Sequence, residues 1–253
     1  MGTKDKLKNG HPAFGGWVMI GHPTSAELMA GEGFDWIAVD MEHTPIDLPT
    51  FENIARAVKP AGCELLVRLS SCDPVLTKRV LDAGADGIIV PLVNTAEMAR
   101  QAVAMAKYPP EGCRGAAFSR ASDFGRNFAP YFKAHNDRVL VAVMLEHIEA
   151  VRNAEAILST PGLDAAFIGP YDLSCSMGLP GQLDHPDVQA AQQTILSACR
   201  KNKVAPGIHV VPVNPDLVQR YVAEGYQFIA CSLDTQFIIH GCRTFLDQSK
   251  KRS

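Results

Sequence analysis

The sequence predicts an α/β protein built as a single (β/α)8 TIM barrel. Eight short runs of apolar and β-branched residues alternate along the chain with segments of helical periodicity. Most of these runs are apolar throughout, as strands covered on both faces of a parallel sheet are. A chain of 253 residues with 47% apolar content suits one barrel domain spanning residues 1–253.

The eight predicted strands cover residues 14–20, 36–42, 63–70, 87–93, 139–147, 164–172, 205–211 and 227–234. Several of the helical segments between them begin at Thr, Asp or Asn or near a Pro, and several end at Gly. Eight such units favour closure into a barrel over an open doubly wound sheet. No GxGxxG or Walker-type glycine motif follows any strand, which argues against nucleotide binding.

One connection is longer than the others. Residues 110–138 separate the fourth helical segment from the fifth strand, and loops of this length are usually functional or disordered. Arg114, Arg120 and Arg126 in this loop either hold a substrate anion or are surface arginines on a lid or a subunit contact.

Composition excludes several classes of partner. The formal net charge is -3 with both signs spread along the chain, so neither a nucleic acid nor an acidic membrane surface is expected as a partner. The apolar runs are too short for a membrane span, and the first residues have no signal-peptide core, so we expect a cytoplasmic protein. Seven cysteines without a CxxC pair predict reduced thiols.

In a barrel the carboxyl ends of the strands converge on one mouth, so polar residues at strand ends become neighbours. Asp40 is expected either to face a buried arginine or to brace the site, and His147, His209 and His240 are expected to be structural or peripheral. The polar residues at the predicted strand ends are Asp40, Glu42, His43, Arg68, Glu146, His147, Asp172, His209 and Asp234.

These residue types indicate enolate chemistry on a 2-oxo acid. Glu146 and Asp172 come from adjacent predicted strands, and two close carboxylates repel unless a divalent cation such as Mg²⁺ or Mn²⁺ lies between them. A lone carboxylate at a strand end can instead be a helix cap or an ion pair. Arg68 can clamp an oxyanion, and His43 can move a proton near neutral pH. Backbone N–H groups after Gly169 and Pro170 can hold a carboxylate.

Lysine is absent from the predicted strands. None of the eight segments contains an inward amine that could form a Schiff base with a ketone. Metal-assisted enolisation is therefore the preferred interpretation over covalent catalysis.

Several motifs together resemble the HpcH/HpaI family of class II, metal-dependent pyruvate aldolases. The resemblance is colinear over roughly residues 14–240, and its motifs are FDWIAVDMEH, VRLSSCDPVLTKRVLDAGADGIIVPLVNTAEMARQAV, YPPEGCRG and FIGPYDLSCSMGLPG. Any one of these motifs is of modest specificity, but their joint order is specific. Members of the family act on 4-hydroxy-2-oxo acids.

The resemblance implies a role for several residues of this chain. It implies Glu146 and Asp172 as ligands of Mg²⁺, Mn²⁺ or Co²⁺, and Arg68 as a contact to the pyruvate enolate and the aldehyde oxygen. It implies His43 as an acid/base group oriented by Asp82, with the N–H groups of Tyr171 and Asp172 holding the pyruvate carboxylate. It further implies a homo-hexamer that exchanges the last helix, for which residues 235–247 are the candidate.

The expected function is a divalent-metal-dependent aldolase that reversibly cleaves a 4-hydroxy-2-oxo acid into pyruvate and an aldehyde. Met144, Tyr171 and the segment HVVPVNP (209–215) depart from the family pattern and leave the second substrate open. Two alternatives remain at this point. One is a citrate synthase of the same family that uses oxaloacetate and acetyl-CoA, and the other is a non-catalytic barrel that binds a 2-oxo acid.

Overall fold

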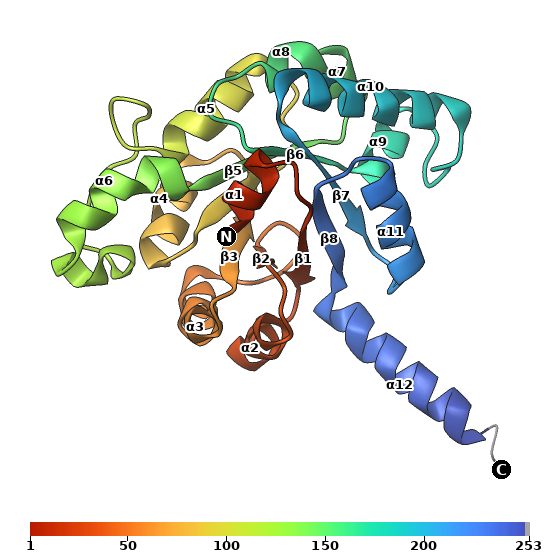
Figure 1. Cartoon of the computed structure of the whole chain (residues 1–253), viewed down its shortest axis with the longest axis horizontal. Helices are drawn as coiled ribbons and strands as arrows, with labels where there is room; N and C mark the ends of the chain where they lie inside the picture. The colour runs from red at the N-terminus through yellow and green to blue at the C-terminus, as the bar shows by residue number, and fades with distance from the viewer. Residues whose placement is uncertain (251–253) are drawn as a thin grey trace.

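Eight parallel strands close into a barrel in chain order, each paired with the next and the last paired with the first (Figure 1). The computed structural model describes residues 1–250. The predicted single-domain (β/α)8 fold is confirmed. The strands are β1 (Ala13–Val18), β2 (Trp36–Asp40), β3 (Glu64–Arg68), β4 (Gly87–Val90), β5 (Leu140–Leu145), β6 (Ala165–Ile168), β7 (Ala205–Val210) and β8 (Phe228–Leu233).

Helices follow the strands as the helical periodicity predicts, and the additions that it did not predict are α1, η2, α6 and α9. The helical segment between β5 and β6 is divided into two short helices that meet at Asn153. The helices are α1 (Thr3–Lys8), α2 (Pro23–Gly31), α3 (Leu48–Val58), η1 (Lys59–Ala61), α4 (Pro74–Ala83), α5 (Ala96–Ala106), η2 (Arg120–Gly125), α6 (Phe128–Arg138), α7 (Ile148–Arg152), α8 (Ala154–Leu158), α9 (Pro170–Ser176), α10 (Pro186–Asn202), α11 (Pro215–Ala223) and α12 (Asp234–Lys250).

The strands end earlier than predicted at the mouth of the barrel. Strand β4 ends at Val90, and Leu92 then takes a left-handed conformation with φ +53°, which is uncommon for a branched residue. Strand β6 ends at Ile168 because Gly169 and Pro170 start helix α9. Apolar residues therefore continue past the ends of the strands into the loops. Because they continue the apolar pattern, the sequence predicts them as part of the strands.

Side chains alternate between the inside of the barrel and the surrounding helices. The inward set includes Trp36, Phe167 and Phe228, whose ring centroids lie 4.4 to 6.1 Å apart and which fill the centre of the barrel. Counting on in steps of two from the inward residues of each strand, the next inward positions toward the mouth are Asp40, Arg68, Glu146 and His209. The alternation thus places four polar side chains above an apolar floor.

Helix α1 lies across the opposite end of the barrel (Figure 1). Its Lys4 donates to the backbone oxygen of Val139 at 2.7 Å and forms an ion pair with Asp164 at 3.1 Å. The N–H of Thr3 donates to Glu64, at the start of β3, at 2.9 Å. These contacts close the amino-terminal end of the barrel, so the carboxyl end holds its open mouth.

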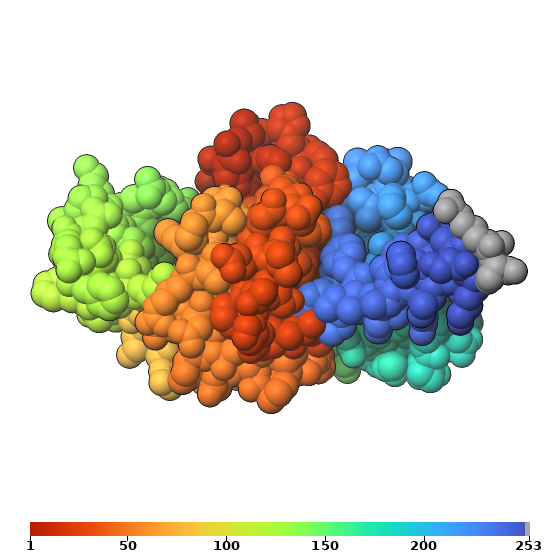
Figure 2. Space-filling model, turned by 90° about the horizontal axis from the view of Figure 1, so that it is seen from below, coloured from red at the N-terminus to blue at the C-terminus, as the bar shows by residue number. Residues whose placement is uncertain are grey.

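Helix α12 projects away from the barrel instead of packing along it (Figures 1 and 2). It starts at Asp234, whose carboxylate accepts hydrogen bonds from the N–H groups of Met19 and Ile20 and from the hydroxyl of Ser25. Asp234 thereby joins the end of β8 to the end of β1 and fixes the direction of the helix. Large apolar side chains of α12 are exposed, namely Ile238, Ile239, Phe245 and Leu246.

We expect Gly15→Ala to lower the melting temperature clearly, because a Cβ at this position would lie about 2.1 Å from the Trp36 indole inside the barrel. Overpacking of this kind costs roughly 1–3 kcal/mol. The matched control is Gly31→Ala at the end of α2, where a Cβ has no neighbour within 4 Å and replacing Gly in a helix is favourable. Equal thermal unfolding of the two variants would contradict this account of the barrel interior.

Candidate active site

Asp40 and Arg68 form the centre of the mouth. They are register partners on β2 and β3, so the parallel pairing itself brings them together. Arg68 donates from Nε to Asp40 Oδ1 at 3.0 Å and from Nη2 to Oδ2 at 2.5 Å, the two-point geometry in which Arg binds a carboxylate strongly. The Asp40 side chain is fully buried and that of Arg68 is 13% exposed. Of the two expected roles for Asp40, facing a buried arginine is the one that the structure shows.

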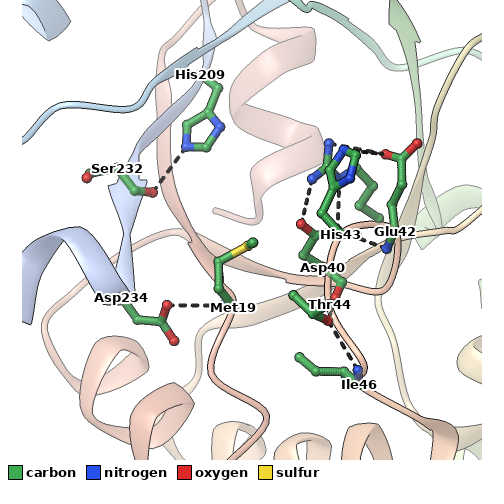
Figure 3. Close-up of polar contacts among 10 residues, drawn as sticks. Met19, Asp40, Glu42, His43, Thr44, Ile46, His209, Ser232 and Asp234 are labelled. Carbon is green, nitrogen blue, oxygen red and sulfur yellow. Dashed lines mark hydrogen bonds and ion pairs between the residues drawn. The ribbon is translucent and has the colours of Figure 1, made fainter.

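The segment after β2 wraps around the Asp40 carboxylate (Figure 3). The backbone N–H groups of Glu42 and His43 donate to Oδ1 at 2.9 and 3.3 Å, and the Thr44 hydroxyl donates to the Asp40 backbone oxygen. Burial alone would raise the pKa of Asp40, but the hydrogen bonds and charge of Arg68 and these N–H groups hold it below its ordinary value. Asp40 is therefore a permanent anion that shapes the turn.

Glu42 and His43 lie beside this pair. Glu42 Oε2 is 3.2 Å from Arg68 Nη1 and 3.7 Å from His43 Nε2. Burial raises the pKa of Glu42, against the attraction of Arg68 and His43. The His43 side chain is 60% exposed, so it stands at the rim and can meet a substrate. Sequence reasoning gave Glu42 no role beyond a place among the polar strand-end residues, and only the structure shows that it contacts both Arg68 and His43.

Glu146 is a buried carboxylate just beyond β5. Its Oε1 accepts a hydrogen bond from the N–H of Leu92 at 2.9 Å, which helps to hold the left-handed conformation of that residue. Its other oxygen faces Gly169, where a Cβ would lie within 2.8 Å. Burial, followed by repulsion from Asp172 and Glu42, raises the pKa of Glu146 to about 7, against the hydrogen bond from Leu92 and the charge of Arg68. Asp172, Glu42 and Arg68 thus all lie close enough to Glu146 to act on its charge.

Asp172 and Tyr171 lie in the first turn of helix α9 and are exposed at the mouth. The prediction that Asp172 ends a strand is wrong, because Gly169 and Pro170 begin the helix first. The helix nevertheless brings the Asp172 carboxylate close enough to Glu146 to repel it. The N–H groups of a first helical turn have no partner within the helix, so they are available to an anion.

The donor set at the mouth fits a hard divalent cation. Glu146, Asp172 and Glu42 bring three carboxylates near the single guanidinium of Arg68, and oxygen ligands are what such a cation prefers. Among residues 1–250, no group of three or more His, Cys, Asp or Glu side chains is placed to hold a metal ion. Both observations agree if two carboxylates of the chain would hold such a cation.

Asp82 does not meet His43 within the chain. It lies near the end of α4, at the other end of the barrel, and accepts a hydrogen bond from Arg114 Nη2 at 2.6 Å. Arg114 is buried and also contacts His135 at 2.8 Å, so it anchors the long loop and is not free to hold a substrate anion. Arg120 donates to the backbone oxygen of Ala83. The expected pairing of His43 with Asp82 is therefore absent from the single chain.

The remaining strand-end residues have other partners. Asp234 caps the ends of β1 and β8, and His147 Nδ1 caps helix α7. His209 stacks on Trp17 with ring centroids 5.3 Å apart, while the guanidinium carbon of Arg68 lies 4.7 Å from the centre of the same indole. His209 thus belongs to the mouth, although sequence reasoning left it structural or peripheral. Strands β1–β8 contain no lysine.

Known proteins resemble this chain along nearly its whole length. A family model described as HpcH/HpaI aldolase/citrate lyase matches residues 14–241. A 4-hydroxy-2-oxo-heptane-1,7-dioate aldolase from Salmonella paratyphi C is 41% identical over 240 residues, which are 94% of this chain and 90% of that protein.

Solved structures agree with this. An HpcH/HpaI aldolase/citrate lyase family protein from Burkholderia cenocepacia has 34% sequence identity and a TM-score of 0.92 over 98% of both chains. The citrate synthase SbnG has 27% identity and a TM-score of 0.87 over 98% of this chain and 97% of that chain. The chain thus belongs to the HpcH/HpaI aldolase/citrate lyase family, whose expected motifs led to the same mouth of the barrel.

Proposed function

We propose that this protein is a divalent-metal-dependent aldolase that reversibly cleaves a 4-hydroxy-2-oxo acid into pyruvate and an aldehyde. The observation that carries the proposal is the fixed guanidinium of Arg68, held by Asp40 and Glu42 beside the buried carboxylate Glu146. The Arg68 guanidinium has N–H groups that Asp40 and Glu42 do not use, and it lies next to the carboxylates of Glu146 and Asp172. This combination suits a 2-oxo acid. The 41% identical relative is named as an aldolase, which supports this reaction class.

Glu146 and Asp172 would hold the divalent cation, such as Mg²⁺, Mn²⁺ or Co²⁺. When bound, the cation supplies positive charge that stabilises negative charge on the 2-oxo group. The protein contributes the position of the two carboxylates: one is fixed by the N–H of Leu92 and the other by the start of helix α9.

Arg68 binds the 2-oxo oxygen with the N–H groups that its two carboxylate partners leave over. Because Asp40 and Glu42 fix the guanidinium before substrate arrives, little reorganisation is needed as negative charge develops. The N–H groups of Tyr171 and Asp172 hold the pyruvate carboxylate. These contacts orient the C3–C4 bond toward the rim.

His43 removes the proton from the C4 hydroxyl during cleavage, through a water molecule at the rim. Its exposure and its place next to Glu42 support this role, since a group that works on the second substrate must reach the open side of the mouth. In the reverse direction it returns the proton to the new hydroxyl. Asp82 has no contact with this histidine within the chain, so the orienting role that the resemblance implies stays a prediction.

A citrate synthase is the second candidate function. The 27% identical structure of SbnG, with a TM-score of 0.87, favours keeping it. The two reactions are distinguished by supplying oxaloacetate and acetyl-CoA and measuring free coenzyme A, which a pyruvate aldolase does not release. The higher identity to an aldolase makes cleavage of a 4-hydroxy-2-oxo acid the first choice.

We also propose that α12 is exchanged between subunits of a homo-hexamer. Of its 17 residues only Asp234 is buried, and the place between α2 and the start of α12 is an apolar cavity of about 530 Å³. Leu28, Met29 and Phe34 line it together with Phe237 and Ile238. A helix from a second copy would cover these side chains, and light scattering that shows a monomer would contradict the exchange.

No helix among residues 1–250 is long and apolar enough to cross a membrane. All seven cysteines are free thiols. A cytoplasmic location, which we propose, agrees with the reduced thiols.

The test of the function is a screen of aldehydes with pyruvate and added metal, with products identified by mass. A chelator should abolish condensation, and Mg²⁺, Mn²⁺ or Co²⁺ should restore it in an order set by ligand preference. Borohydride added with pyruvate should leave the enzyme active, because no strand lysine can be trapped. Activity that survives the chelator and is lost to borohydride would mean a Schiff-base enzyme.

We expect Arg68→Lys to reduce kcat/KM by about 100-fold or more, the order found when an oxyanion donor is removed, because an ammonium cannot replace the planar donor set. Circular dichroism should show a folded protein. Arg56→Lys, on the exposed face of α3, is the matched control and should keep full activity. Near-normal kcat/KM for Arg68→Lys would remove Arg68 from the mechanism.

Glu146→Gln should stabilise the metal-free protein at pH 8 more than at pH 5. Burial raises the pKa of Glu146 to about 7 in the folded protein, above its ordinary value of 4.5, so ionisation disfavours the folded state. This penalty is absent below pH 4.5, grows as pH rises to 7 and is complete above it. We expect a gain of roughly 1–3 kcal/mol at pH 8 from denaturant unfolding.

Glu97→Gln, on the exposed surface of α5, is the control for this measurement and should show no such pH dependence. Glu146→Gln should also weaken binding of Mn²⁺ to the folded protein. An equal effect of Glu146→Gln at both pH values would contradict the raised pKa of the native carboxyl group.

A further inference from the structure

His209 lies at the mouth of the barrel on the side of β7. It is the next inward position after Ala205 and Gly207, so its ring points into the barrel. Trp17 stacks against it on one side of the site, and Arg68 contacts the same indole. His209 and the proposed pyruvate-binding arginine are therefore both within about 5.3 Å of one aromatic ring.

The hydrogen bond of His209 fixes its tautomer. Nε2 lies 3.4 Å from the backbone oxygen of Ser232, and a carbonyl oxygen can only accept, so Nε2 carries the proton. Burial, and to a lesser extent the charge of Arg68, lowers the pKa of His209 to about 3. The ring is therefore neutral at working pH, and Nδ1 presents a bare lone pair.

Nδ1 has no hydrogen-bond partner in the chain from residue 1 to residue 250. In Figure 3 it is on the edge of the ring turned toward Asp40 and His43. The ring itself is only partly buried, and Nδ1 is not among the enclosed polar atoms, so a molecule in the mouth can reach it. Nδ1 of His209 therefore makes no hydrogen bond among the described residues that stabilises the fold.

The other polar groups on this side of the mouth already have hydrogen-bond partners or are out of reach of a ligand. The Asp234 carboxylate accepts from the N–H of Met19 after β1 and from the Ser25 hydroxyl at the start of α2, and the Ser232 hydroxyl donates to the backbone oxygen of Val211 at 2.7 Å. Trp17 Nε1 has no partner, but protein encloses it and a ligand cannot reach it. Nδ1 of His209 remains as the accessible side-chain acceptor on these strands.

The charges of the loops after β7, β8 and β1 further restrict the class of aldehyde that can bind there. The loops that follow β7, β8 and β1 contain no lysine or arginine, as the segments 211–214, 234 and 19–22 show. A distal carboxylate on the second substrate would therefore find no permanent cation there within the chain. A hydroxyl group, in contrast, would find an acceptor.

We propose that His209 is a specificity-determining residue that accepts a hydrogen bond from a hydroxyl group of the aldehyde, so that the second substrate is a neutral hydroxyaldehyde. This inference rests on the proposed function, because it concerns the second substrate of the same site. Pyruvate and its ligands occupy the side of β3, β5 and α9, which leaves the side of β7, β8 and β1 for the aldehyde substituent. The segment HVVPVNP (209–215), which begins with His209 and departs from the family pattern, would then determine which aldehyde is accepted.

The experiment compares aldehydes that differ only by a hydroxyl in place of a methyl group. Condensation with pyruvate is measured as kcat/KM for glycolaldehyde against propanal and for 3-hydroxypropanal against butanal. The wild type should prefer the hydroxylated member of at least one pair by about tenfold, the size of one good neutral hydrogen bond. His209→Leu should bring that ratio to about one.

Two further variants separate the acceptor from the fold. His209→Asn places an amide oxygen near Nδ1 and should keep part of the preference, whereas His209→Gln reaches the Nε2 position and should lose it. His11→Leu, an exposed histidine before β1, is the matched control and should leave the ratio unchanged. The Asn and Gln pair decides the question if the Leu variant does not fold.

A wild type without the preference, or a preference that survives His209→Leu, would overturn the inference while the aldolase function stands. Failure to condense any aldehyde with pyruvate would overturn the proposed function, and the inference with it. A higher rate with an aldehyde bearing a carboxylate than with either hydroxyaldehyde would also count against it.

Discussion

The buried pair of Asp40 and Arg68 is the interaction on which the rest of the mouth depends. Two charges taken out of water are stable only when each is well compensated, and losing one partner of such a pair typically costs about 3–5 kcal/mol. The pairing of β2 with β3 provides that compensation, because the two residues are opposite each other in the sheet. The Asp40 carboxylate then organises the N–H groups of the next turn, which carries Glu42 and His43 to the rim.

This arrangement leaves an imbalance of charge elsewhere. Asp40 and Glu42 surround the guanidinium, so little of its positive charge is left to compensate Glu146 and Asp172. Burial, followed by repulsion from Asp172 and Glu42, raises the pKa of Glu146, and the left-handed Leu92 donates its N–H to the same carboxylate. A site whose arginine is already paired in this way suits a ligand that brings further positive charge, as the divalent cation that we propose would do.

The sequence predicted the barrel well because eight βα units leave few other topologies. Strand-end reasoning also placed Arg68 and Glu146 at the mouth, since inward positions near a strand end must face it. It misplaced Asp172, because the Gly-Pro start of a helix looked like more strand. The role of Asp82 came from the resemblance and stays a prediction, and its contact with Arg114 from a distant loop could not be read from the sequence. The inward position of His209 could have been predicted by counting in steps of two along β7. The hydrogen bond that leaves Nδ1 free as an acceptor depends on the backbone oxygen of Ser232, and no periodicity reveals the left-handed conformation of that residue.

Helix α1 gives the barrel one closed end and one working end. Lys4 and Thr3 bind the starts of distant strands, so the first residues are part of the closure, while Met1 is exposed beyond them. An attachment through Met1 would thus lie on the face opposite the catalytic groups. The enzyme could be tethered to a solid support by that residue with its substrate entrance turned toward the solution.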